Sequence, residues 1–74
     1  MKESGYDQEI AERITKNLRT AIETSGKLKR EIAEAAGISN AVITQYISGR
    51  SQPSLPTLHK LCRVLDVTPD DIIN

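Results

Sequence analysis

The sequence contains no tryptophan and no phenylalanine, and its only aromatic side chains are those of Tyr6 and Tyr46. A chain of 74 residues is long enough for one domain. Because large aromatic side chains are almost absent, we expect a small core of isoleucine, leucine, valine and alanine. Such a core leaves a domain of this size with a stability of about 3–5 kcal/mol.

Residues with metal-binding or catalytic chemistry are equally scarce. Cys62 is the only cysteine, which excludes a disulfide within the chain and a zinc site made of cysteines alone. His59 is the only histidine, with no second ligand at a metal-binding spacing around it. A glycine-rich phosphate loop and a Ser/His/Asp arrangement are absent too. We therefore expect no enzymatic activity, metal, cofactor or small-molecule site, with His59 on the surface and Cys62 a buried thiol.

Long hydrophobic segments are also missing. No uninterrupted apolar run approaches the roughly 20 residues that span a membrane. Residues 1–9 contain no apolar run typical of a signal peptide, and a single cysteine fits a reducing compartment. These features lead us to expect a cytoplasmic protein that does not act at a membrane.

The net charge is zero, but the charges are unevenly distributed along the chain. Residues 26–63 contain six Lys and Arg against two Glu, whereas residues 1–25 contain four cations and five acids. Residues 64–74 contain three Asp and no cation. The positive charge therefore gathers in the middle of the chain, where it is either ordinary solvated charge or the contact surface for a polyanion.

Apolar residues recur at spacings of three and four, which is typical of amphipathic helices, and no segment shows the alternation of a strand. The sequence thus predicts an all-α bundle of five short helices over residues 7–74, preceded by a flexible segment at 1–6. The expected helices run from about Asp7 to Thr24, from Leu28 or Lys29 to Ala36, from Asn40 to Ser48, from Ser54-Leu55-Pro56-Thr57 through Leu65, and from Thr68-Pro69 to Ile73.

The most informative stretch is Ile32–Gly49, where two of these helices are separated by a very short break. Gly37 can adopt the positive φ that ends a helix, and the oxygen of Ser39 can cap the next one. Two helices joined by a three- or four-residue turn containing glycine form a helix-turn-helix, whose second helix enters the major groove of DNA.

The chain resembles the phage-repressor/Cro-like helix-turn-helix domains from about Lys27 to Ile73. The matching segments are Glu31-Ile32-Ala33, Gly37-Ile38-Ser39, Ile43-Thr44-Gln45-Tyr46, Gly49-Arg50, Pro53-Ser54-Leu55-Pro56-Thr57-Leu58 and Leu65-Asp66-Val67-Thr68-Pro69-Asp70-Asp71-Ile72-Ile73. The resemblance implies a lambda-repressor-like fold in a bacterial or phage-encoded protein associated with the nucleoid. It implies a transcriptional regulator, expected to be a repressor, that binds a palindromic operator in double-stranded DNA as a homodimer.

The resemblance also implies which residues touch DNA. Base contacts are expected from the exposed face of the helix at about 40–48, namely from Asn40, Ala41, Thr44 and Gln45. Phosphate contacts are expected from Lys29, Arg30, Ser39 and Arg50, and such contacts position a protein without selecting a sequence. The residue chemistry agrees, because Asn and Gln side chains can each donate to and accept from the major-groove edge of adenine.

Two features leave a second function open. The net charge is low for a nucleic-acid binder, and Ile47 stands where many members of the resembled family have a glutamate. Ile47 could enlarge the core or provide an apolar surface for a protein partner. The alternative is therefore a protein-interaction module, such as an antitoxin or a regulator subunit.

Overall fold

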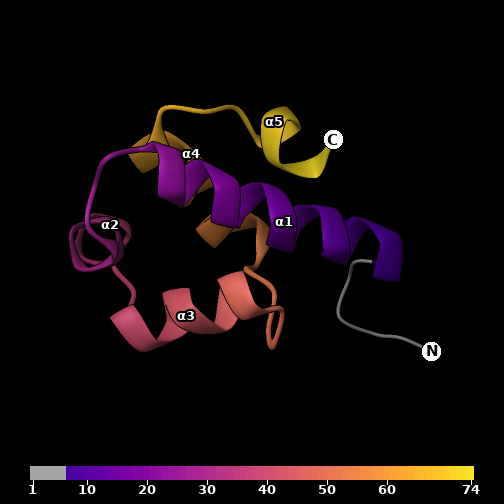
Figure 1. Ribbon diagram of the computed structural model, residues 1–74, viewed down its shortest axis with the longest axis horizontal. Coiled ribbons are helices and arrows are strands. Elements are labelled where there is room, and N and C mark those ends of the chain that lie inside the picture. Colours follow the sequence, from indigo (N-terminus) through magenta and orange to yellow (C-terminus); the bar gives the residue numbers. More distant parts are fainter. Residues whose placement is uncertain (1–6) are drawn as a thin grey trace.

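A computed structural model describes residues 7–74, which form five α-helices and, over that range, no strand (Figure 1). The expected all-α fold is confirmed. The segment expected to be flexible, 1–6, lies outside the described residues. The helices are α1 (Gln8–Thr24), α2 (Lys29–Ala36), α3 (Asn40–Ser48), α4 (Leu55–Leu65) and α5 (Pro69–Ile73).

Side-chain caps explain where four of the helices begin. Asp7, which the sequence placed in the first helix, instead precedes α1, and its carboxylate accepts a hydrogen bond from the Ile10 amide. Ser39, Ser54 and Thr68 cap α3, α4 and α5 in the same way. Each cap provides a hydrogen-bond acceptor for an amide that has no partner within the helix. The caps therefore stabilise helices that begin at these residues.

The start of α2 is capped differently, because Leu28 stands where the resembled family has a serine or threonine. The Leu28 side chain has no acceptor atom, but its backbone N–H donates to Oε1 of Glu31 at 3.1 Å. This is one half of a capping box. The helix consequently begins at Lys29. Because the Glu31 N–H donates to the Leu28 carbonyl, only the amides of Lys29 and Arg30 are left for solvent or a ligand.

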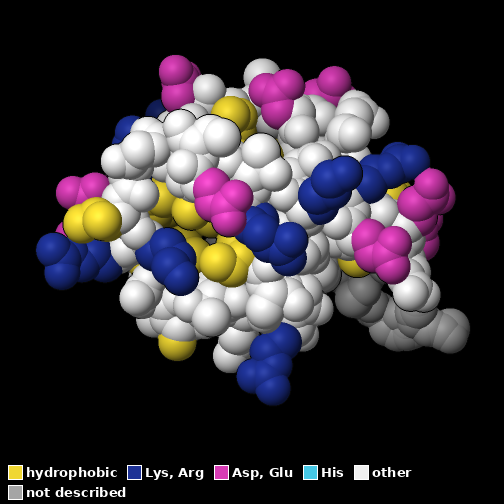
Figure 2. Space-filling model, viewed as in Figure 1, with side chains coloured by type: hydrophobic (Ala, Val, Ile, Leu, Met, Phe, Trp, Pro, Cys, Tyr) yellow, Lys and Arg dark blue, Asp and Glu magenta, His cyan; other side chains and the backbone are white. Residues whose placement is uncertain are grey.

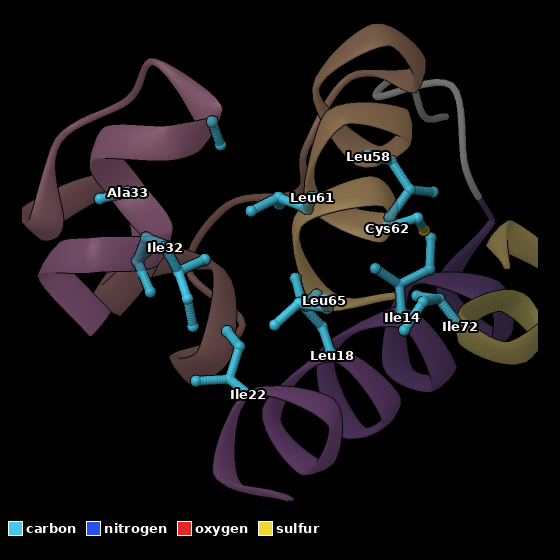
Figure 3. Close-up of a cluster of buried hydrophobic side chains, with 12 residues drawn as sticks. Ile14, Leu18, Ile22, Ile32, Ala33, Leu58, Leu61, Cys62, Leu65 and Ile72 are labelled. Atoms are coloured by element: carbon cyan, nitrogen blue, oxygen red, sulfur yellow. The ribbon is translucent and has the colours of Figure 1, made fainter. Parts of the chain in front are cut away.

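The five helices share one aliphatic core. Ile14 and Leu18 of α1 point toward Cys62 and Leu65 of α4, and Ile22 lies on the side of α2, as Figure 3 shows. α1 crosses the middle of the molecule between α5 and α3 (Figure 1). The complete set of buried apolar residues is Ile14, Leu18, Ile22, Ile32, Ala33, Ala36, Ile43, Leu58, Leu61, Cys62, Leu65 and Ile72.

Two details of the core differ from the simplest expectation. Pro53, in the connection between α3 and α4, is fully buried although it lies between helices. Tyr46 is only half-buried, although it packs against the core and burial raises the pKa of its hydroxyl. A proline has no amide that needs a partner, so burying it in a loop leaves no donor unsatisfied.

Replacing a central core side chain should strongly destabilise this small domain. Leu61→Ala removes a fully buried side chain, and such changes cost about 2–5 kcal/mol. We expect a large fall in the urea midpoint of unfolding, measured by circular dichroism. Leu28→Ala is the control, because Leu28 is 54% exposed and its truncation should change stability by less than about 0.5 kcal/mol. Equal effects of the two changes would contradict this core.

The capping box of α5 should make stability depend on pH. The Thr68 N–H donates to Asp71 Oδ2 at 3.0 Å, and this bond, followed by the effect of the Thr68 hydroxyl, lowers the pKa of Asp71. A lowered pKa in the folded state contributes stability above the unfolded pKa of about 3.9, and that contribution is lost as the pH falls through the folded pKa.

Asp71→Asn should therefore destabilise the domain most near neutral pH, and the difference from the parent should shrink as the solution becomes acidic. Urea unfolding at several pH values between about 7 and 3 measures this. Glu23→Gln, on an exposed turn of α1, is the matched control and should keep the pH dependence of the parent. A gap between Asp71→Asn and the parent that stays constant across this range would refute the role of the carboxylate.

Candidate functional site

The turn between α2 and α3 fixes the geometry of the helix-turn-helix. Gly37 has a φ of 74°, and its N–H donates to the Glu34 carbonyl at 3.2 Å, while the Ile38 N–H donates to the Ala33 carbonyl at 2.9 Å. These two bonds form a Schellman motif, which ends α2 and reverses the chain. Two residues later Ser39 starts α3, its hydroxyl oxygen accepting from the Val42 N–H at 3.1 Å.

The C-terminal end of α3 has the same hydrogen-bond pattern as the C-terminal end of α2. Gly49 has a φ of 82°, its N–H donates to the Tyr46 carbonyl, and the Arg50 N–H donates to the Gln45 carbonyl at 3.0 Å. Both ends of this nine-residue helix are therefore hydrogen-bonded. Isolated helices of this length are not stable in water, so the end contacts and the core together hold α3 in shape.

The structure leaves all four expected base-contacting side chains exposed on α3. Its buried side is formed by Ile43, with Tyr46 and Ile47 partly buried beside it. Val42 is half-buried as well. The residues on the exposed side are Asn40, Ala41, Thr44 and Gln45.

Hydrogen bonds leave these exposed side chains with free polar groups. The Thr44 hydroxyl donates to the Asn40 carbonyl at 3.2 Å, so its oxygen can still accept. Oε1 of Gln45 accepts from the Ser51 hydroxyl at 3.4 Å, so the Nε2 group of Gln45 remains a donor toward solvent. The helix thus presents a mixture of donors, acceptors and a small apolar side chain, which is the chemistry that base edges in the major groove require.

The four expected phosphate-contacting residues lie around this face and are also exposed. Lys29 and Arg30 are in the first turn of α2, where free backbone amides and the helix dipole favour an anion. Arg50 follows Gly49 at the opposite end of α3. Ser39 keeps its hydroxyl hydrogen, because the cap uses only its oxygen.

A groove between α2 and the start of α3 brings two of these groups together. It measures about 620 Å³, and Arg30 and Asn40 both line it, with Ile38 between the helices. Glu31 and Glu34 line the same groove, so its lining has two carboxylates against one cation. The groove as a whole therefore does not attract an anion, and only the side of it beside Arg30 is basic.

Charge is segregated over the surface. In Figure 2, basic side chains occupy the band over α1 and between α1 and α3, and another lies below α3, whereas acidic side chains gather over α5 and at one end of α1. Although the net charge of the chain is zero, the side near α3 is basic and the side near α5 is acidic. A surface of this kind can orient the domain toward a polyanion even without a net positive charge.

Two serines that the sequence analysis did not single out belong to the same region. Ser48 is exposed on the last turn of α3, and its hydroxyl donates to the Gln45 carbonyl at 3.1 Å. Ser51 donates to the side chain of Gln45. Helical spacing could have identified Ser48, which lies three and four residues after Gln45 and Thr44. Nothing in the sequence pattern indicates Ser51, because its contact depends on the fold of the loop.

The two remaining candidate residues, His59 and Cys62, lie outside this region. His59 is exposed and Cys62 is buried, and burial followed by the nearby Asp71 carboxylate raises the pKa of the Cys62 thiol, which makes it a poor nucleophile. Over residues 7–74, no group of three or more His, Cys, Asp and Glu is placed to hold a metal ion. Within the same range, no helix is both long and apolar enough to cross a membrane.

Comparisons with known proteins agree with this geometry. A family model described as helix-turn-helix matches residues 18–72, from the middle of α1 to α5. Searches of curated proteins and of solved structures gave no match. The matched family, of the Cro/C1 type, consists of DNA-binding transcription regulators. Because the match covers well over half of the chain and includes both helices and the turn, this protein belongs to the Cro/C1-type helix-turn-helix family.

Proposed function

We propose that this protein binds a specific sequence of double-stranded DNA as a transcriptional repressor, with α3 in the major groove. The observation that carries the proposal is the exposed polar face of a helix whose two ends are both hydrogen-bonded. Asn40, Ala41, Thr44 and Gln45 contact bases in this arrangement, and Lys29, Arg30, Ser39 and Arg50 contact phosphates. Binding requires no metal or cofactor, and a domain bound at an operator blocks that stretch of DNA.

The proposed assembly is a homodimer on a palindromic operator. One α3 presents few base contacts, so a second copy is needed to read a site long enough to be specific, with half-sites about 34 Å apart. We place the dimer contact at the loop 51–53 and around Asp70–Ile73. Leu55, two residues after that loop, is 65% exposed, which supports this location because burial of exposed apolar surface drives association.

The alternative function, a protein-interaction module, receives less support. Ile47 is partly buried and packs against the core, so it enlarges the core instead of offering an apolar surface. The near-zero net charge remains its only basis. Under the favoured proposal the protein acts in the cytoplasm, on the nucleoid of a bacterium or on phage DNA.

Selection of bound sequences from a random DNA pool tests the proposal. We expect a palindromic consensus, and affinity for it should fall steeply as salt rises, because each phosphate contact releases counterions. A protein-interaction module would enrich no sequence. Failure to bind any DNA at low salt would rule out the proposed function.

Two substitutions then separate base contacts from phosphate contacts on the selected operator. Gln45→Ala should relax the preference at one base position and cost about 1–3 kcal/mol there. Lys29→Ala should weaken binding to all sequences alike and reduce the salt slope by about one. His59→Ala, exposed on α4, is the control and should leave affinity unchanged. If Gln45→Ala and Lys29→Ala affect every sequence equally, α3 does not contact the bases as proposed.

The dimer is tested by sedimentation of variants with a charge at the proposed contact. Leu55→Asp and Ile73→Asp should yield monomers, because a buried, unpaired carboxylate strongly destabilises an interface. Leu28→Asp is the matched control: Leu28 is the other large exposed apolar side chain, at 54% exposure, and lies outside the proposed contact. Folded Leu55→Asp and Ile73→Asp variants that remain dimeric would disprove this location.

A further inference from the structure

Side-chain hydrogen bonds join three pairs of residues that are far apart in the chain, and within residues 7–74 all three pairs involve α1. Nδ2 of Asn17 donates to the Ile72 carbonyl in α5 at 2.8 Å. Arg19 donates to the Ile47 carbonyl in α3. Nε2 of Gln52 donates to Oγ1 of Thr15 at 3.2 Å. Two of the three therefore hold the end of α3 and the loop behind it.

Arg19 makes the stronger of these two contacts. Its Nε and Nη2 both donate to the Ile47 carbonyl, at 3.0 and 2.6 Å. The last carbonyls of a helix have no partner within it and form the negative end of its dipole. α3 has no basic residue in its own last turn, so a guanidinium from α1 provides the missing donor and the compensating charge.

The second contact fixes the loop that leaves α3. Gln52 is tied to Thr15, and a Cβ added at Gly49 would already touch the Thr15 side chain, at 3.7 Å. Arg50 and Ser51 lie between Ile47, whose carbonyl accepts from Arg19, and Gln52, so α1 holds the chain on both sides of them. We call Arg19 and Thr15, together with their partners Ile47 and Gln52, the α1 clamp.

The α1 clamp is accessible from solvent. Thr15, Arg19 and Gln52 line an open groove of about 550 Å³ between α1 and the end of α3, together with Lys16 and Ser48. Arg19 is exposed and not part of the core. Replacing it therefore opens no cavity in the core, and the contact with α3 can be tested without unfolding the domain.

We propose that Arg19 is a positioning residue for α3: its two hydrogen bonds to the Ile47 carbonyl set the orientation of the last turn of α3 and of the loop bearing Arg50. The inference rests on the proposed DNA-binding function. Because Gln45 and Thr44 lie within one turn of Ile47, a small rotation of this end moves both relative to a base edge. Arg19 is thus expected to affect discrimination between sequences and not the attraction to phosphates.

The test compares Arg19→Lys and Arg19→Gln with the parent. Lys keeps the charge without the two-pronged donor, and Gln keeps one donor without the charge. Both should bind the selected operator about fivefold more weakly, a factor equivalent to about 1 kcal/mol for a lost hydrogen bond. Affinity for random DNA and the slope of binding against salt should stay at the parental values. Asn17→Ala is the matched control, because it removes a comparable bond from α1 to α5.

Other outcomes overturn the inference. If Arg19→Gln weakens binding to operator and random DNA alike and lowers the salt slope by about one, while Arg19→Lys behaves as the parent, Arg19 is a phosphate contact. If neither variant differs from the parent, or if Asn17→Ala lowers operator discrimination equally, Arg19 has no special role in orienting α3.

A measurement without DNA distinguishes failure of this inference from failure of the proposed function. The Gly49 and Arg50 amides donate to carbonyls of the last turn of α3, so their hydrogen exchange reports whether that turn opens. Exchange should be about fivefold faster in Arg19→Lys and Arg19→Gln than in the parent, and unchanged in Asn17→Ala. If the parent binds no DNA but exchange is faster in the Arg19 variants, Arg19 does hold the end of α3, and only the proposed DNA-binding function is wrong. If exchange in the Arg19 variants equals that of the parent, Arg19 does not hold the end of α3 and the inference is wrong.

Discussion

The rest of the structure depends on how Ile43 is held. It is the only fully buried residue of α3, and a nine-residue helix has too few hydrogen bonds to persist without its neighbours. Its side chain enters a core built from α1, α2 and α4. Because this one anchor faces inward, the opposite side of α3 must face solvent. The polar residues exposed there are therefore a direct consequence of where Ile43 is buried.

One anchor leaves rotation and tilt of α3 undetermined, and the ends of the helix limit both. Glycines with positive φ follow α2 and α3, and Ser39 caps the start of α3. Arg19 adds a contact from α1 at the far end. Local turn chemistry therefore sets the angle between α2 and α3, whereas long-range hydrogen bonds relate α3 to the remainder of the bundle. A base-reading helix needs both, since hydrogen bonds to bases tolerate little displacement.

Acidic and basic side chains are concentrated on different helices. Acidic residues begin α5, where they cap the helix and favour its positive end, and basic residues lie around α2 and α3. A neutral chain can therefore present a basic side to DNA and an acidic side elsewhere, which reduces nonspecific attraction to any polyanion. Glu31 and Glu34 lie in the groove beside Arg30, so positive charge is not continuous over the basic side.

Much of this protein was determined by the sequence itself. Apolar spacing, capping residues and glycines acted over a few residues, so the five helices, the core stripe and the exposed face of α3 could all be predicted, and the turn at Gly37–Ser39 indicated the family. Only the tertiary structure decided the burial of Pro53, the packing of Ile47 against the core and the contact between Ser51 and Gln45. It also decided the bonds that Arg19 donates to the end of α3 and that Thr15 accepts from the loop after it. These contacts join residues that come together only when the chain folds. The spacing of apolar residues in the sequence does not indicate which side chain will donate to a carbonyl 28 positions away.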